Sequence, residues 1–320
     1  MNKPLVTIIT ATYNLIENNR KSFFIQMVNS VRNQTYSNIE HLIIDGGSTD
    51  GSIELFKELG LNYISEPDNG IYDAFNKGVK HAKGQYINFM NSDDFFCNNK
   101  AVELSVNALI KTNADFLCAS ANILDENGNL DVVFKPRMKS VFCKMPFCHQ
   151  TMFTKTDTLR SLGGFDLKYK SASDYDFIIK LVLNNAKYVT LKDITASFRA
   201  VGESVVNFEK SCNEQVAIFQ ENYSKYIKTS FEECQRAFIV SCPPLRLLLS
   251  AHIKDISMYL YIFNYYLKEL RKSIFYFRMS KDKKKRFLAV FRKYIIKPEG
   301  YDVLNPPEDI KEFVRRVKNN

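Results

Sequence analysis

The segment Gly84-Gln85-Tyr86-Ile87-Asn88-Phe89-Met90-Asn91-Ser92-Asp93-Asp94 decides how the rest of the chain is interpreted. Its apolar residues predict a short buried strand entered from a glycine turn, and residues 91–94 predict the loop that leaves it. In open α/β sheets, ligands bind just beyond the carboxyl ends of the strands. Two adjacent carboxylates there repel each other unless a cation, a basic group or a proton compensates them. Asp93 and Asp94 are therefore candidate ligands of Mg2+ or Mn2+ shared with substrate phosphates, and a solvated turn is the alternative.

The chain on either side of this segment alternates between strand and helix patterns. Before it, strands are expected at residues 5–10, 39–44 and 62–65, and helices at about 20–33, 52–59 and 71–82. This alternation with short connections predicts an α/β fold with a mainly parallel sheet covered on both faces. After it, Asn127-Gly128 between two apolar runs predicts a hairpin, which makes the sheet mixed. Further helices are expected at 100–111 and 174–183, and further strands at 115–120, 151–153, 189–191 and 194–198.

The length of 320 residues allows two domains. Residues 1–205 hold the strand and helix patterns, and residues 206–320 have a helical pattern, so we expect a sheet-containing domain followed by a helical region. The seven cysteines form no CxxC pair, and the four histidines are scattered. This argues against a disulfide framework, a zinc site or a histidine-built metal centre.

The N-terminal sequence and the hydropathy predict a cytoplasmic protein. The first ten residues lack the charged region, the long apolar region and the cleavage site of a signal peptide. No uninterrupted apolar run reaches the roughly 18 residues needed to cross a bilayer.

The positive charge is concentrated in the helical region. Residues 246–297 carry 14 Lys or Arg residues against three acidic residues, within a chain whose net charge is +9. Basic amphipathic helices rich in Tyr and Phe suit the anionic inner face of a membrane, and we predict peripheral attachment there. A helical bundle with a solvated rim is the alternative. Because no nucleic-acid-binding motif accompanies the basic stretch, no nucleic acid partner is expected.

Polar residues also follow the first two expected strands. Residues 10–14 form a polar turn after the first strand, and Asp45 ends the second. In a doubly wound sheet these exits share one edge with Asp93 and Asp94, so we expect them to converge on one cleft. The glycine spacing matches neither GxGxxG nor GxxxxGK[ST], which disfavours a dinucleotide-binding fold and a P-loop ATPase.

Four motifs resemble, in order, those of the family 2 glycosyltransferases, which are inverting enzymes with the GT-A fold. They are Thr10-Ala11-Thr12-Tyr13-Asn14, Asp45-Gly46-Gly47-Ser48-Thr49-Asp50-Gly51, Asn76-Lys77-Gly78 with Ala82-Lys83-Gly84, and Asn91-Ser92-Asp93-Asp94. The resemblance covers about residues 3–205. Residues 66–74, Glu-Pro-Asp-Asn-Gly-Ile-Tyr-Asp-Ala, are similar to the branch that builds bacterial surface polysaccharides.

The resemblance implies a UDP-sugar site. Asp45 would accept the uracil N3–H, and the base and ribose would be framed by Thr10, Thr12 and Tyr13. Asp93 would bind the metal that bridges the donor diphosphate, with Asp94 as a reserve ligand. Asn91 stands where the family usually has a first Asp. It can hydrogen-bond the ribose, but the loss of one negative charge weakens the expected affinity for the metal.

The resemblance also implies a catalytic base. Residues 171–176, Ser-Ala-Ser-Asp-Tyr-Asp, resemble the family's Glu-Asp base motif with Ser173 in place of Glu. Asp174 would deprotonate the acceptor hydroxyl, which requires only hydrogen-bond reach of the nucleophile. The alternative is that Asp174 is the N-cap of the helix that starts there.

Four further residues are weaker candidates. Tyr72, Asp73 and His149 are predicted on the acceptor side, although each also suits a structural role. Residues 197–204 resemble the family's loop after the last core strand, which implies that Arg199 lies in a flexible, glycine-containing loop that could close onto the diphosphate. A solvent-exposed Arg199 is the alternative.

The sequence therefore predicts a GT-A-like catalytic domain followed by a basic helical region. The expected reaction is metal-dependent, inverting transfer of a hexose of the Glc, Gal or GlcNAc type from a UDP-sugar to a polyprenyl-diphosphate-linked saccharide, as in O-antigen or capsule synthesis. One alternative is a sugar-phosphate nucleotidylyltransferase, which should carry a Gly-rich, Lys- or Arg-containing loop after its first strand. The other is a catalytically silent, membrane-bound module that binds nucleotide sugars.

Overall fold

The computed structural model describes residues 3–125, 127–200 and 208–240, together with residues 260 and 263. The chain divides into two compact units. The first is Met1–Val141 with Met145–Val206, and the second is Phe142–Lys144 with Asn207–Asn320.

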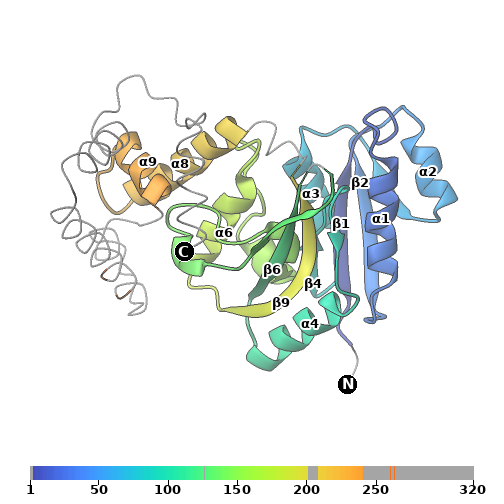
Figure 1. Cartoon of the computed structure of the whole chain (residues 1–320), viewed down its shortest axis with the longest axis horizontal. Coiled ribbons are helices and arrows are strands. Elements are labelled where there is room, and N and C mark those ends of the chain that lie inside the picture. The colour runs from blue at the N-terminus through green and yellow to red at the C-terminus, as the bar shows by residue number, and fades with distance from the viewer. Residues whose placement is uncertain (1–2, 126, 201–207, 241–259, 261–262, 264–320) are drawn as a thin grey trace, which may run out of the picture. The chain divides into compact units, whose positions relative to one another are not determined.

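The first unit is built on a nine-stranded mixed sheet with helices on both faces (Figure 1). The strand order is β3-β2-β1-β4-β8-β6-β9-β5, and β7 pairs with β6 outside this path. Neighbouring strands among β1–β4 are parallel, β8 runs antiparallel between β4 and β6, and β6 pairs parallel with β9. This confirms the predicted mixed, mainly parallel α/β fold. The strands are β1 (Val6–Thr12), β2 (Ile39–Asp45), β3 (Asn62–Ser65), β4 (Tyr86–Phe89), β5 (Phe95–Phe96), β6 (Phe116–Leu124), β7 (Leu130–Phe134), β8 (Phe153–Lys155) and β9 (Tyr188–Arg199).

Helix α1 is amphipathic and buries one face against the sheet. In α1, the buried side chains are spaced three or four residues apart, as on one face of a helix. They join a core cluster with Val6 and Ile8 of β1. The helices of the first unit are α1 (Lys21–Arg32), α2 (Ser52–Glu58), α3 (Ile71–His81), α4 (Ala101–Thr112), α5 (Thr156–Ser161) and α6 (Ser173–Leu183), with short 3-10 helices η1 (Met138–Ser140) and η2 (His149–Thr151).

Helix α3 packs unusually close to β1 and β2. A Cβ atom at Gly78 would lie 2.6 Å from Ile9 Cγ2 and 3.2 Å from Ile44 Cγ1, so only glycine fits there. On the same side of the sheet, the rings of Phe75, Phe89 and Phe165 form a cluster with centroids 4.7 to 5.7 Å apart. This cluster fixes the height of α3 above the sheet, and α3 carries candidate residues of the acceptor side.

The structure differs from the expected elements at several places. The strand predicted at 151–153 begins later, as β8, because residues 149–151 form η2 instead. The two strands predicted at 189–191 and 194–198 are one strand, β9, whose pairing with β6 continues through irregular register between them. The two-residue strand β5, which pairs with β9, was not predicted because two residues carry no periodicity.

The second unit is helical where the structure describes it. It contains α8 (Phe208–Ser224) and α9 (Phe231–Val240), and the hydroxyl of Tyr223 in α8 donates to the carbonyl oxygen of Phe142. Among the described residues, none of the helices combines the length and the apolar character that a membrane crossing requires. The basic stretch 246–297 lies outside the described residues apart from two isolated positions, so its membrane attachment stays a prediction.

We predict that Gly84→Ala destabilises the fold for a steric reason. The added Cβ would lie 2.5 Å from the backbone nitrogen of Thr7 and 2.7 Å from its hydroxyl, at the turn that enters β4. Overpacking of this kind costs about 1–3 kcal/mol of unfolding free energy, measurable by chemical denaturation.

Gly128→Ala is the matched control for this substitution. Gly128 has a φ of +82° but nothing within 4 Å of an added Cβ, so only backbone strain of about 1 kcal/mol is expected. An unchanged stability of Gly84→Ala would contradict the close packing at the entry of β4.

Candidate active site

Asp45 ends β2 and joins three strand ends through one carboxylate. The residue is fully buried, and both of its oxygens are acceptors. Oδ1 accepts from the hydroxyls of Thr12 (3.1 Å) and Ser48 (2.5 Å), and Oδ2 accepts from the backbone N–H of Gly47 (3.0 Å) and Ser48 (2.8 Å) and from the hydroxyl of Ser65 (2.8 Å). A uracil N3–H would have to displace one of these five donors. The contact of Asp45 with uracil therefore stays a prediction. The structural role of Asp45 is to hold the ends of β1, β2 and β3 together.

A second carboxylate lies over the turn that follows Asp45. A Cβ atom added to Gly46 would lie 2.8 Å from Asp68 Oδ2 and 3.2 Å from the ring of Tyr13. Tyr13 is 61% exposed, and burial raises the pKa of Asp68. Oδ1 of Asp68 accepts from the N–H of Gly70 at 2.8 Å. Sequence reasoning missed Asp68, and the only signal was its place in the 66–74 segment, where its approach to Gly46 cannot be read from spacing.

Thr10 and Thr12 face the protein interior. Thr10 is fully buried, and its hydroxyl contacts the sulfur of Met27 at 3.6 Å and Nε2 of His41 at 3.2 Å. The hydroxyl of Thr12 is a donor to Asp45. Both threonines therefore support the sheet edge, and their predicted contacts with a base or ribose stay predictions. Tyr13 is the member of this turn that presents its side chain to solvent.

Asp93 is compensated by a cation. It is 6% exposed, and its carboxylate forms an ion pair with the guanidinium of Arg20, which lies just before α1. This is the basic partner that the repulsion between adjacent carboxylates requires. Arg20 was not predicted, because it lies 73 residues away in sequence and carries no local motif.

Asp94 is held by donors from three segments. It is buried, and it accepts hydrogen bonds from Asn91 Nδ2 (3.0 Å), Gln150 Nε2 (2.6 Å) and the backbone N–H of Arg199 (2.8 Å). Burial, followed by the charge of Asp93, raises the pKa of Asp94 to about 7. A carboxylate engaged in this way is poorly placed to bind a metal, and its role as a reserve ligand stays a prediction that this geometry disfavours.

Arg199 is the last residue of β9 and not part of the following loop, which corrects the expected placement. It is 8% exposed, and its guanidinium lies 4.4 Å from the ring centroid of Phe23 and 5.0 Å from that of Phe95. It donates to the carbonyl oxygen of Asp93 and to Oε1 of Gln26, each at 2.5 Å. Arg199 therefore braces residues 91–94, the acidic loop that follows β4, and a contact with a diphosphate would require these interactions to be released.

The residues present fit a metal that is shared with a substrate. Within the described part of the chain, no group of three or more His, Cys, Asp or Glu side chains could enclose an ion. Asp93 supplies one carboxylate at the strand exit. Mg2+ in proteins is commonly bound by one or two carboxylates together with substrate phosphates, and Asp93 suits that mode.

Asp174 lies in the first turn of α6, one residue after the helix begins. The helix N-cap is Ala172, so the alternative that Asp174 is the cap is wrong. Oδ1 accepts from the hydroxyl of Tyr72 (3.0 Å) and from the N–H of Tyr175 (2.9 Å), and Oδ2 lies 3.1 Å from Nδ1 of His149. The predicted base is thus contacted by Tyr72 and His149, two of the three residues predicted on the acceptor side.

His149 also contacts the acidic loop. Its Nε2 lies 3.4 Å from Oδ1 of Asn91, so the ring lies between Asp174 and the segment that follows β4. Asp73, in contrast, lies in the first turn of α3, and its carboxylate accepts hydrogen bonds from the backbone and side-chain nitrogens of Asn69 in the preceding loop. Asp73 lines a shallow hollow, and its acceptor role stays a prediction. The hollow is lined by Asn69, Gly70, Ile71, Tyr72, Asp73, Leu167, Tyr169 and Lys170.

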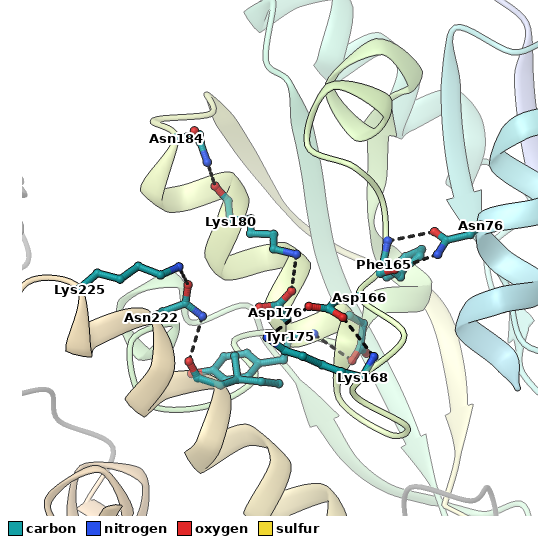
Figure 2. A network of polar contacts seen from close by, with 12 residues as sticks. Asn76, Phe165, Asp166, Lys168, Tyr175, Asp176, Lys180, Asn184, Asn222 and Lys225 are labelled. Carbon is teal, nitrogen blue, oxygen red and sulfur yellow. Dashed lines mark hydrogen bonds and ion pairs between the residues drawn. The ribbon is translucent and has the colours of Figure 1, made fainter. Parts of the chain in front are cut away.

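The side chain of Asn76 connects α3 to the turn before α6. Figure 2 shows its amide facing the backbone of Phe165, to which it donates at 2.8 Å and from which it accepts at 2.9 Å. A Cβ at Gly164 would lie 2.5 Å from Asn76 Oδ1, and Gly164 has a φ of +67°, so this close approach needs glycine. The contact places the Phe165 ring 5.5 Å from that of Tyr72, which supports the hydroxyl that reaches Asp174.

A mainly parallel sheet with carboxylates at its strand ends is typical of enzymes that bind nucleotide-containing substrates. The sequence model of glycosyl transferase family 2 matches residues 7–158. An uncharacterized glycosyltransferase of Mycobacterium tuberculosis is 33% identical over 208 residues, which cover 62% of this chain and 76% of the relative. The chain therefore belongs to glycosyl transferase family 2.

Solved structures share the fold. S. aureus TarS 1-349 in complex with UDP-GlcNAc superposes with a TM-score of 0.57 at 18% identity, covering 74% of this chain and 72% of TarS. The mannosyltransferase PcManGT from Pyrobaculum calidifontis, in complex with GDP-Man and Mn2+, has a TM-score of 0.57 at 16% identity and covers 84% of this chain and 81% of its own. At these identities the likeness shows the fold alone, and it agrees with the predicted GT-A-like architecture.

We predict that Arg20→Gln destabilises the protein in EDTA. The substitution leaves Asp93 without the guanidinium that pairs with it, which should lower the free energy of unfolding by about 1–3 kcal/mol. Adding Mn2+ with UDP should recover part of this loss, because a cation then takes over the compensation.

Lys83→Gln is the control, because it removes an ion pair whose lysine is largely exposed and whose N–O distance to Glu40 is 3.9 Å. That variant should change stability by less than about 0.5 kcal/mol. Equal effects of the two variants in EDTA would contradict the role assigned to Arg20.

Proposed function

We propose that this family 2 glycosyltransferase transfers a hexose from a UDP-sugar to a polyprenyl-diphosphate-linked saccharide with inversion, in surface polysaccharide synthesis. The observation that carries the proposal is the contact chain from Asp174 through His149 to Asn91. This contact chain brings Asp174, the predicted base, next to residues 91–94, the predicted donor-binding loop. A direct displacement at the anomeric carbon requires such proximity.

The proposed nucleotide site lies at the ends of β1 and β2. The exposed ring of Tyr13 offers a stacking surface for the base, and the carboxylate of Asp68 lies beside it. Asp68 Oδ2 or a rearranged Asp45 would accept the uracil N3–H. A carboxylate acceptor selects uracil over cytosine, because cytosine has no proton at N3. The bound UDP-GlcNAc of S. aureus TarS supports a uridine donor for this chain by analogy of fold.

The proposed diphosphate site is at Asp93. A divalent cation held there would neutralise charge on the leaving UDP, and PcManGT was solved with Mn2+, which supports Mn2+ or Mg2+ here. Arg20 would move away from Asp93 or turn toward the diphosphate. Its guanidinium suits phosphate oxygens as well as a carboxylate.

The proposed base is Asp174. Its Oδ2 would accept the proton of the acceptor hydroxyl as that oxygen attacks the anomeric carbon opposite the leaving UDP. The hexose would be joined in the configuration opposite to that of the donor, which is a β-linkage from an α-linked donor. Tyr72, Asp73 and the hollow in front of α3 would contact the acceptor.

The proposed setting is the cytoplasmic face of the cell membrane. The basic stretch 246–297 would attach the enzyme to anionic lipids, close to a lipid-linked acceptor. The division into a catalytic domain, residues 1–205, and a helical region, residues 206–320, belongs to this proposal. A catalytically silent nucleotide-sugar-binding module is the remaining alternative, whereas a nucleotidylyltransferase is disfavoured by the family assignment.

We predict that Asp174→Asn abolishes transfer without abolishing donor binding. With a panel of UDP-sugars, Mn2+ and a synthetic polyprenyl-diphosphate saccharide, kcat for UDP release should fall by at least about 100-fold. The Kd for UDP should stay within about twofold, measured by calorimetry. Asp157→Asn, on the exposed side of α5, is the matched control and should be unaffected. Full activity of Asp174→Asn would contradict the assignment, and no transfer by the natural chain would favour the silent module.

We predict that Asp68→Asn weakens UDP binding by about tenfold, because a hydrogen bond to a charged acceptor is lost. Calorimetric titration with UDP and Mn2+ measures the effect. Asp131→Asn, on the exposed strand β7, is the control and should bind UDP as the natural chain does. Unchanged affinity of Asp68→Asn would remove Asp68 from the proposed base site.

A further inference from the structure

None of the proposed chemical steps uses the side chain of His149. It is the first residue of η2, and it lies between the α6 helix that carries Asp174 and the loop that follows β4. The side chain of His149 is 16% exposed and that of Asp174 is 14% exposed, so both groups have little contact with solvent. A polar contact in such a place fixes a side chain better than one at the open surface.

The two oxygens of Asp174 have different surroundings. Oδ1 accepts from the hydroxyl of Tyr72 and from the N–H of Tyr175, which fills both of its lone pairs. Oδ2 lies 3.1 Å from Nδ1 of His149, and this ring is its polar contact among the described residues. One lone pair of Oδ2 is therefore left to accept the proton of an incoming hydroxyl. The contact with the His149 ring fixes the orientation of the carboxylate, and with it the direction of that lone pair.

The orientation of the His149 ring is itself determined by the acidic loop. The amide of Asn91 donates through Nδ2 to Asp94 Oδ2 at 3.0 Å, so its Oδ1 faces the imidazole. Each ring nitrogen of His149 thus faces an acceptor oxygen, one from Asp174 and one from Asn91. The ring of Phe75 lies edge-to-face with the imidazole, with the two centroids 6.4 Å apart, and limits the rotation of the imidazole.

We propose that His149 is a positioning residue, which holds the carboxylate of Asp174 in register with the donor-binding loop rather than contacting the acceptor sugar. The inference rests on the proposed function of Asp174 as base. The chain of contacts runs from Tyr72 through Asp174, His149 and Asn91 to Asp94. A movement of residues 91–94 would therefore be transmitted to Asp174. The contacts of His149 thus keep the carboxylate of Asp174 at a fixed distance from this loop.

The test uses His149→Ala and His149→Gln in the full chain. His149→Ala should lower kcat about 10- to 100-fold, as expected when a reacting group loses its orientation, while both KM values change by less than about threefold. His149→Gln should retain more activity than His149→Ala, because the glutamine amide can donate to Oδ2. A raised acceptor KM with an unchanged kcat would overturn the proposal, since it would identify His149 as an acceptor contact.

A double-mutant cycle with Asp174→Asn separates positioning from other roles. If His149 acts only through Asp174, His149→Ala should have no further effect in the Asp174→Asn background. Additive losses would overturn the proposal. Asp157→Asn, on the exposed side of α5, is the control and should leave kcat unchanged in either background.

The failure of this inference can be distinguished from the failure of the proposed function. Absence of transfer by the natural chain would overturn the function alone. A crystal structure of His149→Ala tests positioning without activity, because the Asp174 side chain should then adopt another rotamer or become disordered. An Asp174 carboxylate that keeps its place in that variant would overturn the positioning role.

Discussion

The site depends on the burial of the Asp94 carboxylate at the end of β4. A buried carboxylate must be hydrogen-bonded, and Asp94 takes its donors from the loop after β4, from η2 and from the end of β9. These three segments are far apart in sequence, and this one group holds them together. Because Gln150 is fixed by Asp94, its neighbour His149 is fixed as well, and so is the contact with Asp174. The strain of placing two carboxylates side by side is reduced by the guanidinium of Arg20 on Asp93.

A similar arrangement is found at the end of β2. Asp45 holds the ends of β1 and β3 and the turn after β2, and it leaves its lone pairs engaged within the protein. The groups next to it are the exposed ring of Tyr13 and the half-buried carboxylate of Asp68. The buried acids thus shape the edge of the sheet, while their more exposed neighbours are the groups that a ligand meets first. This separation explains how the edge can be rigid and still bind a substrate.

The sequence predicted the fold class because alternating periodicity and glycine turns report directly on a mainly parallel sheet. It also predicted the strand exits at Asp45 and Asp93, which follow from the order of the strands. It did not predict Arg20, Gln150 or Asp68, since each acts through a contact between segments remote in sequence. Arg199 was expected in a loop because residues 197–204 resemble the family's loop after the last core strand, whereas the structure ends β9 with this residue and packs it against two aromatic rings. Local patterns identify elements, and buried polar contacts between elements determine which side chains remain available to a ligand.

A crystal structure of the full chain with UDP and Mn2+ would test the proposed site most directly. We expect uracil against the ring of Tyr13 and beside Asp68, the ion between Asp93 and the diphosphate, and the β-phosphate directed toward the Oδ2 side of Asp174. Nucleotide bound away from the ends of β1, β2 and β4, or an Asp174 carboxylate turned away from the diphosphate, would contradict it.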